Sequence, residues 1–254
     1  MNIEQFCELA HQHEQCSTND EDGVTSVIEE MFNESPFYKA NHVRSNLDYI
    51  HLYKYLREFC CQKSLYTNRQ GPVCPFLPRA FKEQSIYFFD DIYSETKQEL
   101  IEIVRQCRND YLSVLKPIEF ENRSLIVYKT LIILIRNTSI SHEIVDQIQM
   151  ELKSEFILKY GLMLGEFHLS SNSSAIKNKD FYPLRTKTPL LVIRRLVAND
   201  IIFLNQKDRY SKDIRSKMIK MYIDLDKNGL LHSRKDHYLR TAHELLHELN
   251  NNDE

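Results

Sequence analysis

Polar side chains that could bind a ligand gather between two apolar runs in residues 160–205. The first run covers 162–167, and the second covers 189–197. Both runs have strand character, and ligands are often held by polar groups on a loop fixed between buried strands. We therefore predict a binding site in this stretch. Its candidate residues are His168, Asn178, Arg185 and Arg194.

A second cluster lies upstream, in the Pro-rich segment 71–79 with the sequence GPVCPFLPR. Three prolines remove backbone donors and favour extended geometry, so we expect the segment 71–78 to be non-helical. Cys74 and Phe76 are its candidate site residues. If the two clusters form one site, Cys74 or Phe76 should lie near His168 in the fold.

Together these residues suit haem. The iron of haem takes a histidine or a cysteine thiolate, and arginines pair with its anionic propionates. We therefore assign the proposed iron ligand to His168 and propionate or substrate contacts to Arg185 and Arg194, with Asn178 and the Cys74–Phe76 turn as further contacts. A histidine in such a place, taken alone, is more often a hydrogen-bonded structural residue.

Other catalytic patterns are weaker. The segment HELLH at 243–247 fits the HExxH zinc pattern on a predicted helix, with both imidazoles on one face. Too few residues follow it for the usual third ligand, and we expect His243 and His247 to be exposed. Serine hydrolysis lacks a G-x-S-x-G elbow. The prolines around Cys74 exclude the helix N-terminus that would activate its thiol. The cysteines include no CxxC pair.

Composition indicates an ordinary globular protein, with 42% hydrophobic and 27% charged residues and a net charge of −3. No membrane span or secretion signal is visible, so we expect a cytoplasmic protein. Residues 1–34 hold acids but no Lys or Arg, and 207–240 are richer in bases. The basic stretch mixes in acids and lacks an aromatic platform, which argues against nucleic acid as a partner. The charged ends could bind a protein partner or simply be solvated.

Helices and strands alternate along the chain without a nucleotide-binding glycine motif. The pattern predicts an α+β fold, with a small mixed sheet flanked by helices. Its main domain covers 41–206, with an acidic helical extension at 1–40 and a helical extension at 207–254. Expected helices are 2–15, 24–32, 46–63, 94–115, 141–159, 198–204, 211–226 and 234–249. Expected strands are 85–89, one or two within 124–136, 162–168 and 189–197.

Three segments resemble an uncharacterised bacterial family of unknown function: GPVCPFLPRA at 71–80, GLMLGEFH at 161–168 and DFYPLRTKTPLLVIRR at 180–195. The resemblance covers about 50–206. A more distant likeness is to the YqcI/YcgG family, some members of which are haem-dependent enzymes that hydroxylate nitrogen on arginine-type amino acids. Cys74 to Phe76 match the turn of that family, His168 its histidine, and Arg185 with Pro189 its Arg-then-Pro order. Leu169 stands where both patterns favour Pro.

The leading hypothesis is a haem-binding, oxygenase-like protein that acts on a small amino-acid-type substrate, with His168 on the iron. One alternative is a non-enzymatic interaction protein on the same scaffold. Another is a cofactor-free enzyme that acts on a small anionic metabolite through the same arginines.

Overall fold

The computed structural model describes residues 51–91, 93–121, 123–229, 231 and 236–251, without the side chains of 116–124. The expected helices at 2–15 and 24–32, and the expected extension at 1–40, lie outside the described residues. The chain forms η1 (Tyr55–Cys60), η2 (Leu65–Thr67), α4 (Leu77–Lys82), β1 (Ile86–Asp91), α5 (Lys97–Glu121), α6 (Arg123–Ile126), β2 (Thr130–Ile135), α7 (His142–Tyr160), β3 (Leu162–Phe167), β4 (Leu190–Arg195), η3 (Ala198–Phe203), α8 (Lys212–Lys227) and α9 (Asp236–Asn251).

A four-stranded mixed sheet lies at the centre of the fold, with the strand order β1-β2-β4-β3. β1 and β2 are parallel and are joined through α5 and α6. β4 is antiparallel to both of its neighbours, so β3 runs in the direction of β2. The loop 168–189 leads from β3 back to β4, which inserts between β2 and β3. This topology confirms the predicted α+β class.

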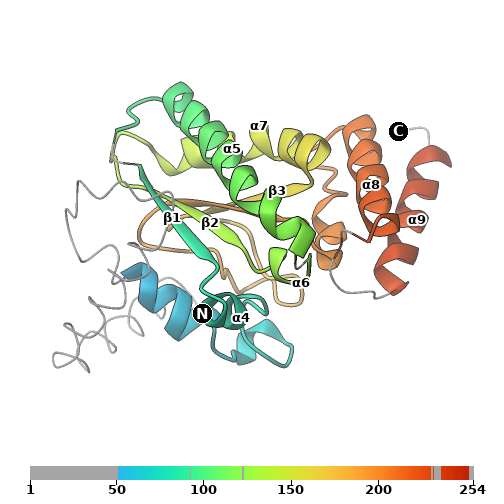
Figure 1. The fold of residues 1–254 in the computed structure, drawn as a ribbon, viewed down its shortest axis with the longest axis horizontal. Coiled ribbons are helices and arrows are strands. Elements are labelled where there is room, and N and C mark those ends of the chain that lie inside the picture. The colour runs from blue at the N-terminus through green and yellow to red at the C-terminus, as the bar shows by residue number, and fades with distance from the viewer. Residues whose placement is uncertain (1–50, 92, 122, 230, 232–235, 252–254) are drawn as a thin grey trace.

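The apolar sequence of β2 follows from its central position, because all six of its residues are buried. One face of the sheet packs on α5 and α7 through Leu131, Ile133 and Ile135. The opposite face packs on the helical segment 51–60 and on α4 through Ile132 and Leu134. A strand covered on both faces reads as a continuous hydrophobic run rather than an alternating one. Figure 1 shows the two layers of helices on either side of the sheet.

The C-terminal helices α8 and α9 add a third cluster of apolar side chains beside the β3 edge (Figure 1). Met163 of β3 and Ile157 of α7 join Met218, Tyr222 and Ala242 there, all of them buried. The hydroxyl of Tyr222 also donates to the carbonyl oxygen of Ala198 at 2.7 Å. α8 and α9 therefore pack against the sheet domain.

α7 and β3 form a tight unit whose ends agree with the sequence prediction. Ser141 is the N-cap of α7, with its side chain accepting from the backbone N–H of Ile144 at 3.4 Å. The helix ends at Gly161, which has a φ of 61°. This left-handed conformation favours glycine and turns the chain directly into β3. The first residues of α7 and the last residues of β3 consequently lie at the same end of the unit.

Two predictions of local structure were wrong in part: the non-helical segment 71–78 and the bounds of the helix at 94–115. α4 begins at Leu77 and contains Pro78, because proline is tolerated in the first turn of a helix, where its missing N–H has no intrahelical partner. α5 continues through Pro117 to Glu121. Its first turn is preceded by Thr96, whose hydroxyl accepts from the backbone N–H of Glu99 at 3.3 Å, so the helix begins later than the predicted residue 94.

Across the described residues, every helix is too short or too polar to cross a membrane.

Candidate functional site

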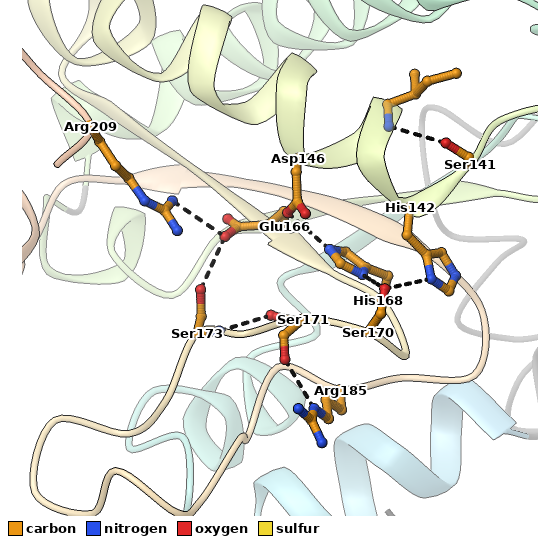
Figure 2. A network of polar contacts seen from close by, with 11 residues as sticks. Ser141, His142, Asp146, Glu166, His168, Ser170, Ser171, Ser173, Arg185 and Arg209 are labelled. Carbon is orange, nitrogen blue, oxygen red and sulfur yellow. Dashed lines mark hydrogen bonds and ion pairs between the residues drawn. The ribbon is translucent and has the colours of Figure 1, made fainter.

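The polar cluster that is best placed for chemistry lies where β3 ends and α7 begins. His142 is the first residue of α7, and Asp146 lies one turn further, on the same face of the helix. His168 follows directly after β3, and the loop carries Ser170 two residues later. Figure 2 shows these four side chains in contact. We call His142, Asp146, His168 and Ser170 the histidine network.

His168 is held by a hydrogen bond at each ring nitrogen. Its Nε2 lies 2.9 Å from Oδ1 of Asp146, and its Nδ1 lies 3.2 Å from Oγ of Ser170. A carboxylate can only accept, which assigns the hydrogen of a neutral imidazole to Nε2. Nδ1 is then a bare acceptor for the hydroxyl proton of Ser170. This is the arrangement that general-base activation of a serine requires.

His142 reaches the same serine from the other side. Its Nδ1 lies 2.8 Å from Oγ of Ser170, and its ring centroid lies 4.9 Å from that of His168. Burial, followed by the nearby imidazole of His168, lowers the pKa of His142. A neutral His142 can donate from Nδ1 to Ser170 while Ser170 donates to His168. The hydrogen bonds therefore run in one direction, from His142 to Asp146.

Solvent access differs along the histidine network. The side chain of His168 is 1% exposed, whereas that of Asp146 is 49% exposed. Ser170 is exposed on the loop. A buried base beside an exposed hydroxyl can activate that hydroxyl toward a molecule arriving from solvent. The half-exposed carboxylate is partly screened, so its pull on the imidazole is weaker than that of a fully buried one.

The loop 168–189 is anchored beside the histidine network. Arg185 donates from Nε to the carbonyl oxygen of Ser171 at 2.9 Å, and its guanidinium lies over the ring of Tyr182 at 4.1 Å. Ser173 donates to Glu166 at 3.3 Å, and Glu166 also pairs with Arg209 at 3.7 Å. The hydrogen bonds and the ion pair among these contacts, drawn in Figure 2, fix the part of the loop that follows Ser170.

The structure brings only two of the six predicted site residues into this region, His168 and Arg185. Arg194 instead forms a bidentate pair with Asp200, with N···O distances of 2.7 and 2.8 Å. Asn178 donates from Nδ2 to the carbonyl oxygen of Tyr66 at 2.9 Å and so joins two loops.

Cys74 and Phe76 have partners other than His168 and its neighbours on α7. Cys74 packs with the apolar cluster on the α4 face of the sheet, and Phe76 contacts Tyr128. His168 bonds to α7, on the opposite face. The two sequence clusters therefore contact elements on opposite faces of the sheet.

The two residues expected to bind the iron and a propionate of haem, His168 and Arg194, have protein partners in this structure. An iron ligand needs a ring nitrogen that faces the metal, whereas both nitrogens of His168 have protein partners. The positive charge of Arg194, which was expected to pair with a propionate, is already neutralised by the carboxylate of Asp200. Within the part of the chain that the structure describes, no group of three His, Cys, Asp or Glu residues could hold a metal ion. His243 and His247 are both exposed on α9, as predicted.

Sequence reasoning missed Asp146, His142 and Ser170. The i, i+4 spacing of His142 and Asp146 just after a helix cap was a readable signal, because it places both side chains on one face. Ser170 belongs to no recognisable motif. It contacts His168, two residues before it, only because the loop turns after β3.

The chain belongs to a family described as "Domain of unknown function (DUF6875)", whose model matches residues 49–226. This confirms the expected membership in an uncharacterised domain family. The match reaches beyond the 50–206 estimated from the sequence and takes in most of α8. Neither the comparison with curated proteins nor that with solved structures gave a match.

Proposed function

For this member of the DUF6875 family, we propose a cofactor-free hydrolase that acts on an ester or thioester of a small anionic metabolite. The observation that carries the proposal is the hydrogen-bonded order Asp146–His168–Ser170, with an exposed hydroxyl at its end. Ser170 is the nucleophile, His168 the general base and Asp146 the group that orients the imidazole. The absence of a G-x-S-x-G elbow is no obstacle, because such sets recur on unrelated folds by geometry rather than by motif.

The chain's own residues supply each proton transfer. Oγ of Ser170 forms a bond with the acyl carbon while its proton passes to Nδ1 of His168. The carboxylate of Asp146 stabilises the resulting imidazolium through Nε2. The leaving alcohol or thiol departs with the proton from Nδ1. Water then attacks the acyl carbon and loses a proton to the same nitrogen. As the bond from the acyl carbon to Oγ breaks and the acid leaves, that proton passes from Nδ1 to Oγ and restores Ser170. General-base assistance of this kind contributes about 10²–10⁴-fold to the rate.

His142 and Arg185 add the two further groups that this reaction uses. Nδ1 of His142 lies 2.8 Å from Ser170 Oγ, and in the tautomer that carries its hydrogen there it can donate to the oxygen that becomes negative during attack. Arg185 is fixed through Nε and by stacking on Tyr182, and among the described residues its terminal nitrogens have no hydrogen-bond partner. Those nitrogens suit a substrate carboxylate or phosphate. Esters and thioesters are favoured over amides because their leaving groups need less protonation.

The proposal is tested with two activated esters that share a leaving group, p-nitrophenyl acetate and the p-nitrophenyl monoester of succinate. Release of nitrophenolate should be saturable, with a higher kcat/KM for the anionic ester. Ser170→Ala and His168→Gln should each lower kcat/KM by at least about 10³-fold. Arg185→Met should remove only the preference for the anionic ester. Ser113→Ala, which changes an exposed serine on α5, is the matched control. Equal activity of Ser170→Ala and the wild type would refute the proposal.

Two hypotheses from the sequence remain as alternatives. The first is a haem-dependent oxygenase, supported by the distant likeness to the YqcI/YcgG family. It requires His168 to exchange Asp146 or Ser170 for iron, and a Soret band in protein from haem-supplied cells would support it. The second is an interaction protein without catalysis. A protein that hydrolyses neither ester and binds no haem would favour it. A bacterial origin of the family and a cytoplasmic location are likewise proposals.

A further inference from the structure

Charged and polar side chains are buried between α7, β3 and the turn 205–210, on the far side of Glu166 from the histidine network. Glu166 is 4% exposed, Lys153 5%, Gln149 1% and Tyr210 6%. Arg209 reaches Glu166 from the turn, as Figure 2 shows. We call this set the lysine cluster: Gln149, Lys153, Glu166, Gln206, Arg209 and Tyr210.

The residues of the lysine cluster come from three segments, α7, β3 and the turn 205–210. Gln149 donates to the carbonyl oxygen of Leu164 at 3.1 Å, two residues before Glu166 on the same side of β3. Lys153 lies one turn further along α7, and helical side chains lean toward the N-terminus, which is toward Gln149 and Glu166. The turn is closed by the bond from Tyr210 N–H to the carbonyl oxygen of Gln206 at 3.0 Å.

Several polar atoms of the lysine cluster lack partners. Oε1 of Gln149, Oε1 of Gln206 and the hydroxyl of Tyr210 are buried, and none has a hydrogen-bond partner among the described residues. The ammonium of Lys153 lies 5.9 Å from the ring centroid of Phe203, again without a hydrogen bond or ion pair in the described part of the chain. Buried polar groups are nearly always satisfied by protein, water or a ligand. Three such atoms on α7 and on the turn 205–210, together with a buried lysine that has no ion pair among the described residues, point to an occupant.

The charge of the lysine cluster defines that occupant. Lys153 and Arg209 carry two positive charges against one negative charge on Glu166, and the neighbouring Arg194–Asp200 pair is neutral. Burial is the main cause that lowers the pKa of Lys153, and Glu166 opposes it. Leaving aside the exposed Lys207 and Asp208 of the turn, whose opposite charges cancel, the surplus within the lysine cluster is one positive charge. A monovalent anion would neutralise it, and the two amide oxygens require a hydrogen-bond donor in the same ligand.

We propose that the lysine cluster binds a small monovalent oxyanion that carries an O–H donor, the chemistry of 2-hydroxycarboxylates and bicarbonate. The anionic oxygens accept from the ammonium of Lys153 and from the hydroxyl of Tyr210. The O–H group donates to Oε1 of Gln149 or Gln206. The inference goes beyond the proposed hydrolase and does not depend on it, since none of these residues belongs to the histidine network.

Glycolate and acetate form a matched probe pair, because they differ only in the hydroxyl group. We expect glycolate or bicarbonate to raise the Tm of the wild type in a concentration-dependent way. Acetate should bind about tenfold more weakly than glycolate, since it leaves an amide oxygen unpaired. Chloride at equal ionic strength controls for the effect of charge alone. Calorimetric titration of glycolate gives the Kd.

Three variants separate the lysine cluster from a general salt effect. Lys153→Met keeps the length of the side chain and should abolish glycolate binding, while folding survives because apolar replacements of buried charges are often tolerated. Tyr210→Phe removes one donor and should weaken binding about tenfold. Lys159→Met, on the same helix with a side chain 64% exposed, should bind like the wild type. Equal effects of glycolate and acetate, no shift with any oxyanion, or binding that survives both Lys153→Met and Tyr210→Phe would overturn the proposal.

Discussion

Replacing Asp200 by Ala removes the acceptor of three hydrogen bonds at the end of β4. Its Oδ2 accepts from Nη1 of Arg194 at 2.7 Å and from the backbone N–H of Val197 at 2.8 Å. Its Oδ1 accepts from Nη2 of Arg194 at 2.8 Å. Asp200 is 1% exposed, so water has little access to the atoms that lose their partner. In the variant, the positive charge of Arg194 lies beside the space that the carboxylate of Asp200 had filled.

The loss of stability follows from that geometry. Breaking a buried ion pair by removing one partner costs about 3–5 kcal/mol. The side chain of Arg194 is 24% exposed and regains part of its hydration, which places the expected loss near the lower end, at about 3 kcal/mol. Because one charge remains uncompensated, Arg194→Met combined with Asp200→Ala should recover part of this loss.

Urea unfolding followed by circular dichroism measures the change in free energy of unfolding. Asp213→Ala is the matched control, because Asp213 pairs with Lys217 at 2.7 Å on the exposed face of α8. We expect that control to cost less than about 0.5 kcal/mol. A cost below about 1 kcal/mol for Asp200→Ala would refute the reasoning. Arg194 would then not depend on Asp200 and could make the ligand contact that the sequence predicted.

Three further predictions concern single residues. Burial and the neighbouring imidazole of His168 lower the pKa of His142, so the unfolded chain binds a proton more readily. Stability should therefore be lost as pH falls below about 6.5 toward the lowered pKa of the folded state, and urea unfolding of His142→Gln should show a smaller loss. Gly161→Ala should cost about 1–2 kcal/mol and lower the Tm, because φ is +61° and the new Cβ would lie 3.2 Å from Cδ1 of Leu225; an unchanged Tm would contradict this. Burial, and then Cys74, raise the pKa of Cys60, so mass spectrometry should find Cys60 alkylated by iodoacetamide only after unfolding.

The local structure of the chain could be read from the sequence where caps and periodicity agree. Ser141 and Gly161 bracket α7, and the apolar run of β2 indicates a strand buried on both faces. The strand order could not be read in this way. β4 inserts between β2 and β3 through pairing between residues far apart in the chain, and no local pattern encodes which strands become neighbours.

The candidate site was predictable in part for the same reason. His168 drew attention as a polar residue at the end of a strand, but its partner Asp146 lies on α7 and becomes relevant only once the helix packs on β3. Arg194 looked free for a ligand because its bond to Asp200 depends on the turn at η3. Cys74 and His168 seemed to share a site because both adjoin strands, and a sequence does not reveal which face of a sheet each segment covers.

Covalent labelling of Ser170 is the most direct test of the account. A fluorophosphonate reacts only with a serine whose proton is taken by a base, so the wild type should gain one adduct, located on Ser170 by peptide mass spectrometry. His168→Gln should lose the labelling, and Ser113→Ala should retain it. A wild-type protein that stays unlabelled, or an adduct on a different serine, would contradict the role of the histidine network.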